Sequence, residues 1–227
     1  YKLPLEGEYG VFKMIVGTIV ATLGSVTIGG VLGVFTAVFI SKFCPKRVKK
    51  VFTAIINLLA GIPSVIFGFF GMNVLLPRLG AFSENGSGSG LLAVSIVLGF
   101  MILPTVVSLS KTSIDAVPDS YYEGALSLGS NHEQAVFRAV VPAAKSGIVA
   151  SIILGIGRAV GETMAVIMVA GNNVNFPKGL FKSFRVLTAN IVMEMSYAGE
   201  VQLGALIATG VVLLIFILIV NVLLGLA

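Results

Sequence analysis

The chain has 227 residues, of which 56% are hydrophobic and only 11% are charged, and its mean hydropathy is +1.03. Soluble domains carry about one quarter charged residues, so this composition excludes a soluble protein and indicates a polytopic membrane protein with one domain, residues 1–227. The formal net charge is +5, and the single cysteine, Cys44, excludes an internal disulfide.

Five apolar segments are long enough to cross a hydrocarbon core of ~30 Å as helices. They predict an all-α fold with five membrane-spanning helices, at Met14–Ile40, Val51–Leu76, Leu91–Ser110, Gly147–Asn172 and Leu203–Leu226.

The second segment is interrupted by the sequence AGIPSVIFGFFG, in which Pro63 removes one backbone hydrogen bond of a helix. Two interpretations stay open. Interruptions by glycine and proline are typical of discontinuous helices near transport sites. They also occur as ordinary kinks that are packed against a neighbouring helix.

Basic residues predict the orientation in the membrane. The loop after the first segment contains five of them: Lys42, Lys46, Arg47, Lys49 and Lys50. The next loop, Pro77–Gly90, contains only Arg78. We therefore expect the first loop, residues 111–146 and the C-terminus to be cytoplasmic, and residues 1–13 to be external. An external N-terminus needs a preceding helix to translocate it, so we expect a further helix upstream of residue 1.

The polar segment Lys111–Ser146 has the pattern of two short helices. Pro118 suits a first helical position, DSYYEGALSL follows as a helix, and Gly129 is a C-terminal stop. Ser130-Asn131-His132-Glu133 is a capping-box pattern that predicts a second helix, EQAVFRAVV, which Pro142 ends. Two interpretations of its apolar side chains stay open: packing on the chain's own helix ends, or docking into a groove of a cytoplasmic partner.

The spacing of Glu123, Ala125, Gly129 and Pro142 resembles the EAA loop of ABC-importer permeases, whose usual form is E-A-A, three residues, G, nine residues, I-x-L-P. The chain departs from that form with Gly124 as the second residue and with Ala and Val in place of Ile and Leu. The resemblance covers essentially the whole chain and implies the type I ABC-importer permease core.

In that family the loop carries a coupling helix that docks into the ATP-binding subunit. The resemblance therefore implies a set of ATPase-coupling residues: Tyr122, Glu123, Gly124, Ala125, Leu126 and Gly129.

Arg158 and Glu162 are the only charges between Gly147 and Asn172. Arg158 follows Gly147 by eleven residues, which in a helix corresponds to a depth of ~16 Å, near the midplane of the membrane. Each such charge costs on the order of 3 kcal/mol to insert, and intramembrane charges typically mark transport pathways. In one continuous helix the two residues share a face. The G-x-x-x-G step Gly157–Gly161 beside them would let another helix approach closely.

Two roles are open for this pair. The first is a structural ion pair, although a buried pair rarely repays its desolvation cost. The second is an anion contact, because a guanidinium group offers a planar fork of donors that suits phosphate. Glu162 would then hold Arg158 while the site is empty and shorten the dwell time of the anion. Thr163 and Ser64 are candidate neutral donors in the pathway, or they satisfy local backbone groups.

The sequences GRAVGETMAV (Gly157–Val166) and IPSVIFGFFG (Ile62–Gly71) resemble the permeases for tetrahedral oxyanions. Sulfate and molybdate permeases usually have F-G-A-T after the glutamate. The residues after Glu162, Thr-Met-Ala-Val, are instead similar to the phosphate-uptake (Pst) permeases and their PstC-type subunit. A permease for sulfate, molybdate or tungstate remains the alternative.

The resemblance implies a multi-pass protein in the cell membrane of a prokaryote that imports inorganic phosphate. It also implies three protein partners: an ATP-binding subunit dimer, a second permease subunit (PstA-like, or a second copy of the chain) and an external phosphate-binding protein. Membrane lipid surrounds such a protein, and no nucleic-acid partner is implied.

The sequence contains no Walker A pattern, no catalytic triad and no cluster of metal ligands. We therefore expect a transport subunit without enzymatic activity or a cofactor of its own, with ATP and Mg²⁺ on the partner ATPase. A third interpretation is a stand-alone ion-coupled carrier in which Glu162 relays protons. The predicted cytoplasmic helix pair argues against it, because such a carrier needs no ATPase dock.

Overall fold

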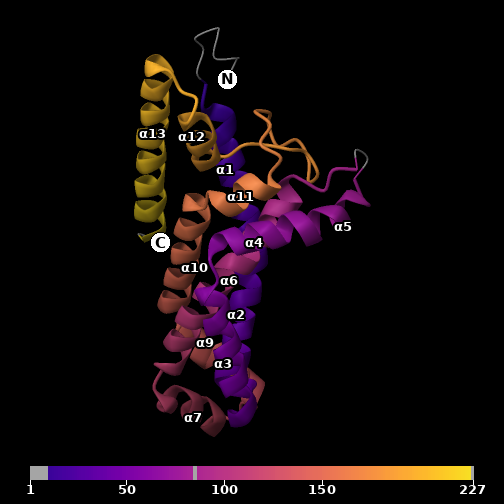
Figure 1. Cartoon of the computed structure of the whole chain (residues 1–227). Helices are drawn as coiled ribbons and strands as arrows, with labels where there is room; N and C mark the ends of the chain where they lie inside the picture. Colours follow the sequence, from indigo (N-terminus) through magenta and orange to yellow (C-terminus); the bar gives the residue numbers. More distant parts are fainter. Residues whose placement is uncertain (1–9, 84–85, 226–227) are drawn as a thin grey trace.

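The computed structural model describes residues 10–83 and 86–225, and their regular structure is helical (Figure 1). The helices are α1 (Phe12–Ser25), α2 (Val31–Val38), α3 (Lys46–Gly61), α4 (Ser64–Phe70), α5 (Leu76–Gly80), α6 (Leu91–Asp115), α7 (Asp119–Ser127), α8 (His132–Ala135), α9 (Val141–Ala143), α10 (Lys145–Gly161), α11 (Met164–Val169), α12 (Leu187–Met195) and α13 (Glu200–Gly225). Four π-helical turns, Val26–Gly30, Phe39–Phe43, Gly71–Leu75 and Val136–Val140, join neighbouring helices into longer ones.

Three of these helical stretches are long and apolar enough to cross a membrane: Phe12–Phe43, which contains α1 and α2, then α6, and then α13. Two further pairs are bent at a break, by 94° between α3 and α4 and by 67° between α9 and α10. Counting each bent pair as one span gives five. The predicted all-α polytopic fold is confirmed.

Helix α6 is the centre of the molecule, because α1, α2, α3, α4, α10 and α11 all pack against it. Of the 18 consecutive residues of α6 that are most apolar, 61% are buried, whereas the same share for α13 is 11%. Helix α13 is also the most hydrophobic of the three long helices. It contacts α10 and α12 and otherwise presents apolar side chains to its surroundings, as a lipid-facing or partner-facing helix does.

Small residues allow α6 to lie close to its neighbours. A methyl group on Gly29 would overlap the carbonyl oxygen of Gly99, and one on Gly33 would lie 2.8 Å from a methyl carbon of Val106. Water does not drive helices together inside a membrane, so van der Waals contact at such close approaches supplies much of the attraction.

The interruption at Pro63 is a complete break between two helices. Ile62 and Pro63 have extended backbones, with ψ of 125° and 140°, and Ser64 begins α4. The interpretation as a discontinuous helix is therefore confirmed, and an ordinary kink is excluded. Helix α4 turns across the molecule and packs on α11, and the helical run continues through α5 to Gly80 (Figure 1).

The contact between α4 and α11 depends on Gly68. A methyl group there would lie 2.8 Å from the Cα of Ala165 and 2.8 Å from the sulfur of Met168. We expect Gly68→Val to lower the free energy of unfolding by about 1–3 kcal/mol, because the backbone of α11 cannot yield without repacking. Thermal unfolding in detergent measures this. Gly204→Val is the control, since no described atom lies within 4 Å of a Cβ there, and an equal loss in both variants would contradict the prediction.

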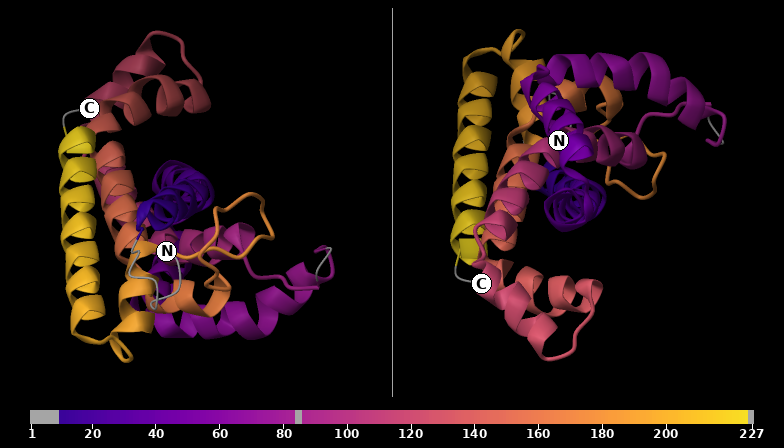
Figure 2. Two further views of the ribbon diagram at one scale, coloured as in Figure 1. Left: turned by 90° about the horizontal axis from the view of Figure 1, so that it is seen from above. Right: turned by 90° about the horizontal axis from the view of Figure 1, so that it is seen from below.

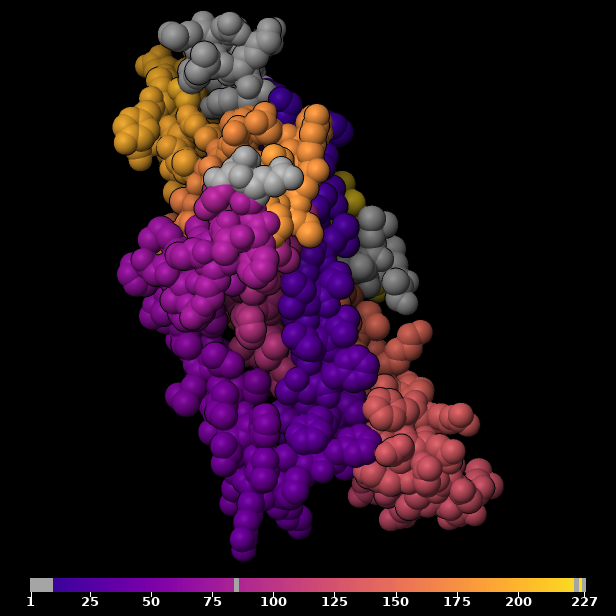
Figure 3. Space-filling model, turned by 90° about the vertical axis from the view of Figure 1, so that its right-hand side faces the viewer, coloured from indigo at the N-terminus to yellow at the C-terminus, as the bar shows by residue number. Residues whose placement is uncertain are grey.

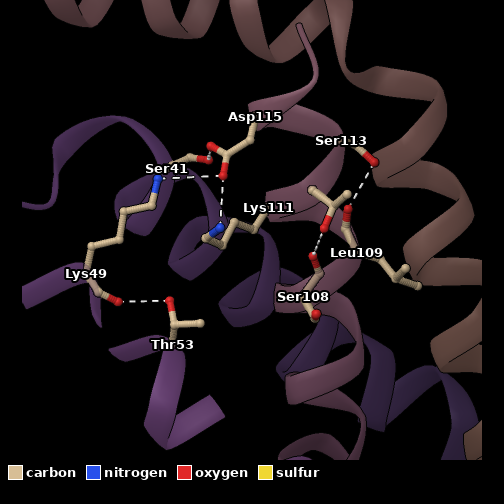
Figure 4. A network of polar contacts seen from close by, with 9 residues as sticks. Ser41, Lys49, Thr53, Ser108, Leu109, Lys111, Ser113 and Asp115 are labelled. Carbon is tan, nitrogen blue, oxygen red and sulfur yellow. Dashed lines mark hydrogen bonds and ion pairs between the residues drawn. The ribbon is translucent and has the colours of Figure 1, made fainter. Parts of the chain in front are cut away.

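A polar cluster connects three elements at the end of the molecule that carries α7, called the α7 end below. Asp115, the last residue of α6, accepts hydrogen bonds from Ser41 and from Lys111, the latter at 2.9 Å (Figure 4). The Nζ of Lys49 lies 3.6 Å from the same carboxylate. The cluster joins the end of the first span to α3 and α6. Because its side chains are about one third exposed, its contribution to stability is small.

The segment from α7 to α9 forms a helix pair that projects from the body of the molecule (Figure 2). Gly129 ends α7 with a φ of +89°, as predicted. The predicted capping box is wrong by one residue: Asn131, not Ser130, accepts the hydrogen bond from the backbone of Gln134, and the side chain of Gln134 accepts one from the backbone of Asn131. The second helical run, His132–Ala143, ends one residue after Pro142 and bends by 67° into α10, so the predicted end at Pro142 is confirmed to within one residue.

Candidate functional site

Arg158 lies in the last turn of α10, and the helix ends three residues later, at Gly161. Glu162 is extended, with ψ of 131°, and α11 begins at Met164. The prediction of one continuous helix through Asn172 is therefore wrong. The break places the positive side chain of Arg158 near the negative end of the α10 dipole and Glu162 just before the positive end of α11, which favours both charges.

The predicted ion pair between Arg158 and Glu162 is absent from the structure, although both residues are described. No nitrogen of Arg158 lies within 4.0 Å of a carboxylate oxygen of Glu162. The carboxylate accepts a hydrogen bond of 3.1 Å from the backbone of Ala165, and the carbonyl oxygen of Glu162 accepts one of 3.0 Å from Thr188. Because the helix ends between the two residues, they no longer share a face, and Glu162 holds the α10–α11 junction.

Arg158 instead faces α6 and α13. Its guanidinium group donates a hydrogen bond of 3.1 Å to the hydroxyl of Thr105 on α6. Both side chains line an open groove of about 600 Å³, together with Asn221 of α13 and four small or apolar residues: Ala150, Ile153, Leu154 and Gly157. Three polar side chains from three helices thus surround a groove between spanning helices, where polar groups are costly unless they serve a purpose.

Thr105 and Asn221 were not predicted from the sequence. A signal for Asn221 existed, because it is the one polar side chain between Val211 and Ala227. Thr105 follows Pro104 inside an otherwise apolar helix, and nothing in the sequence relates it to a residue 53 positions later.

Within the described part of the chain, no helix packs closely on the Gly157–Gly161 step. No described atom comes within 4 Å of a Cβ placed on either glycine. Gly157 lines the groove beside Arg158, so the small residues leave space there instead of receiving a helix of the same chain.

Thr163 and Ser64 lie at the two helix breaks and do not line the groove. The hydroxyl of Thr163 donates to the carbonyl of Gly161 at 3.3 Å, which satisfies a free carbonyl at the end of α10. Ser64 is the first residue of α4, and its side chain is half-buried.

The predicted coupling residues divide between two faces of α7. Tyr122 and Ala125 are partly buried on the face toward the body, where the hydroxyl of Tyr122 lies 2.8 Å from Nδ1 of His132. Glu123 and Gly124 are exposed on the other face, whereas Leu126, one turn after Tyr122, is 39% exposed at the edge between the two faces. Gly129 and its neighbour Leu128, which is 90% exposed, follow at the end of the helix. No side chain of α7 is fully buried, so the outward face is available to a partner.

The ring of His132 packs against its own chain. It lies edge to face with Phe43 at 4.8 Å and with Tyr122 at 5.7 Å between ring centroids. The packing interpretation of the helix pair therefore holds for its inward face, and the docking interpretation concerns only the outward face.

A second polar cluster, which was not predicted from the sequence, lies at the end opposite α7. Arg185 forms an ion pair of 2.7 Å with Glu194 and donates to the side chain of Asn190 and the backbone carbonyl of Asn172. Gln202 donates to Glu194 at 3.3 Å. This cluster connects the chain after α11 to α12 and α13.

The fold and the groove define a class of protein: an all-helical membrane permease with broken helices and a projecting helix pair. A family model described as "Binding-protein-dependent transport system inner membrane component" matches residues 11–227. The chain belongs to this family. It is the permease of an ABC importer and not itself the catalytic subunit, which excludes the ion-coupled carrier, and such a permease requires an ATPase and a substrate-binding protein.

Three relatives show where in the family the chain lies. It is 39% identical to the probable ABC transporter permease protein YqgH of Bacillus subtilis, over 92% of this chain and 69% of the relative. It is 32% identical to the phosphate transport system permease protein PstC of Mesorhizobium japonicum, over 93% and 71%. The PstC of Haemophilus influenzae is 31% identical, over 93% and 73%.

Solved structures share the fold at lower identity. An inward-facing form of the methionine ABC transporter MetNI matches with a TM-score of 0.69 and 19% identity, over 99% of this chain and 96% of that one. An amino acid ABC transporter matches with a TM-score of 0.65 and 21% identity, over 94% and 90%. The predicted permease core is thereby confirmed.

Proposed function

We propose that this permease imports inorganic phosphate and that Arg158 is the residue that contacts the anion. The observation that carries the proposal is the groove between α6, α10 and α13, in which a guanidinium group is held by a neutral hydroxyl and by no carboxylate of the described residues. An arginine without a paired carboxylate keeps its charge available for an oxyanion. The PstC relatives support phosphate as that oxyanion.

Each polar residue of the groove has a proposed role. Arg158 supplies the charge and a fork of donors, while Thr105 orients the guanidinium group from one side. Asn221 adds an amide donor from the opposite helix. The remaining lining is apolar, so the anion has few contacts and leaves readily, which a transport site requires.

The breaks at Pro63 and Glu162 are part of the proposal. Helix α4 follows the first break and α11 follows the second, and the two short helices pack on each other. Discontinuous helices of this kind accompany transport sites because their ends offer unpaired backbone groups and can move as units. Thr163 and Ser64, at these breaks, are proposed as positioning residues of the pathway.

The proposed assembly contains an ATP-binding dimer at the outward face of α7, and the nucleotide and Mg²⁺ belong to that dimer. A second, PstA-like permease subunit completes the pathway, and an external protein delivers phosphate. The α7 end is cytoplasmic in this assembly, as is the C-terminus, because the loop that begins α3 carries the basic residues.

Uptake of labelled phosphate by the reconstituted transporter tests the substrate. We expect ATP-dependent uptake that excess unlabelled phosphate abolishes and that equal concentrations of sulfate, molybdate or tungstate leave nearly unchanged. Stronger competition by one of these three anions than by phosphate would assign the chain to that anion.

The proposed orientation predicts which positions are labelled from outside the cell. In a Cys44→Ser background, Lys178→Cys should react with a membrane-impermeant maleimide added to intact cells, because this position is exposed at the end opposite α7. Lys46→Cys should react only after the membrane is opened. The reverse pattern would invert the orientation.

A further inference from the structure

A second hollow lies at the end of the molecule opposite α7 and shares no lining residue with the groove of Arg158. Its volume is about 590 Å³, and its lining comes from the start of α1, the chain before α6 and the loop 171–186. Figure 3 shows the orange loop beside the indigo start of α1 at this end of the molecule. Three lysines line it: Lys13, Lys178 and Lys182. The other lining residues are Ser87, Asn173, Asn175, Phe176, Phe181 and Ser183, so the described lining contains no carboxylate.

The loop that carries two of these lysines is fixed at several points. The backbone of Phe184, whose side chain is fully buried, donates to the carbonyl of Ala170 at 3.2 Å. Leu92, at the start of α6, donates to the carbonyl of Leu180 at 2.9 Å. Arg185 closes the base of the loop through the carbonyl of Asn172. A surface that is already ordered loses little conformational entropy when a partner binds.

Aromatic contacts fix the opposite wall. Phe12 lies edge to face with Phe176 at 6.1 Å between centroids, and the Nζ of Lys13 lies 5.8 Å from the centroid of the same ring. These contacts join α1 to the loop, so that Lys13 of α1 lines the same hollow as Lys178 and Lys182 of the loop.

The size and lining of the hollow indicate a peptide segment and not a lone ion. Pockets of 300–1,000 Å³ hold molecules the size of a drug, about that of a few amino acids, whereas a single oxyanion fills a small part of such a space. Lysines are hydrated point charges on flexible stems, which suit carboxylates in a wet contact. Two phenylalanines add apolar area for the stems of the partner's side chains.

We infer that this lysine hollow is the docking site for an acidic loop of the external solute-binding protein that this permease family requires. The inference rests on the proposed orientation, in which this end faces outside. The lysines attract the carboxylates of the partner and raise the rate of encounter, and the aromatic rings fix its register.

The test measures association of the phosphate-loaded phosphate-binding protein of the same organism with the whole transporter in nanodiscs. The variant is Lys178→Gln/Lys182→Gln. At low salt we expect its association rate constant to be about tenfold lower than that of the unaltered transporter, because electrostatic steering is lost. Near 1 M salt, where the Debye length is ~3 Å, we expect the two rates to converge.

The control is Arg78→Gln, which removes a positive charge from an exposed position outside the hollow, in the loop that is expected on the same side of the membrane. It should associate at the unaltered rate. Zero-length coupling of amines to carboxylates, followed by mass spectrometry, should join Lys178 or Lys182 to an Asp or Glu of the binding protein.

Equal association rates for the variant and the unaltered transporter would overturn the inference. Equal rates are also the result expected if free phosphate or an anionic lipid headgroup, and not the binding protein, occupies the hollow. Failure of the unaltered transporter to bind the phosphate-binding protein would instead count against phosphate as the substrate, and the comparison would then be repeated with the sulfate- and molybdate-binding proteins.

Discussion

Arg158→Gln is expected to reduce phosphate uptake at least about thirtyfold, while the transporter still assembles. Glutamine keeps a neutral donor but removes the charge and the fork of the guanidinium group, and the loss of one partner of a charged hydrogen bond away from water costs about 2 kcal/mol or more. Assembly should be retained, because Arg158 forms no ion pair within the described chain and its only described side-chain hydrogen bond is to Thr105. Uptake into vesicles and co-purification of the ATPase are the two measurements.

Three further variants make this result specific. Arg158→Lys keeps the charge without the fork and should retain part of the uptake. Thr105→Val should lower uptake modestly, because it removes the acceptor that orients the guanidinium group. Arg78→Gln removes a charge from exposed α5 and should leave uptake unchanged. Normal uptake by Arg158→Gln would remove Arg158 from the pathway.

Changes on the outward face of α7 are expected to release the ATPase. Leu126→Asp introduces a charge where an apolar side chain is exposed at the edge of this face. We expect the affinity for the ATP-binding subunit to fall at least about thirtyfold, as for a residue at the centre of an interface. Deletion of residues 123–129 should abolish the complex. Co-purification and ATPase activity stimulated by the binding protein measure both effects.

The inward face provides the control. Tyr122→Phe removes the contact with Nδ1 of His132 but leaves the outward face intact, so it should cost about 1 kcal/mol of stability and retain the ATPase. Gly124→Ala should also retain it, since a Cβ there meets open space and alanine favours the helix by about 1 kcal/mol. Release of the ATPase by Tyr122→Phe, together with its retention by Leu126→Asp, would assign the dock to the opposite face.

Most of the fold follows from patterns among near neighbours in the chain. Long apolar runs have to become helices in a membrane, because the backbone can satisfy its hydrogen bonds in no other local way. The apolar runs alone predicted the membrane-spanning helices α6 and α13. Glycine and proline in the sequence predicted the end of α7 at Gly129 and the break at Pro63. The capping box was misplaced by one residue because Ser130 and Asn131 are both good N-caps.

The site required the tertiary structure. Arg158 was found from the sequence, since a charge inside an apolar segment is conspicuous whatever its surroundings. Its partner was not, because the sequence could not show that α10 ends at Gly161. That break separates Arg158 from Glu162 and gives each a different role.

The sequence by itself determined the composition of each helix, the class of protein and the cation within the fourth apolar segment. Only the tertiary structure shows that Thr105 and Asn221 lie in the same groove as that cation. It alone also shows the ion pair of Arg185 with Glu194 and the three lysines that line one hollow. The physical reason is the same in each case. Helix formation is decided by residues within a few positions of one another, whereas these contacts are decided by how whole helices pack and where they break.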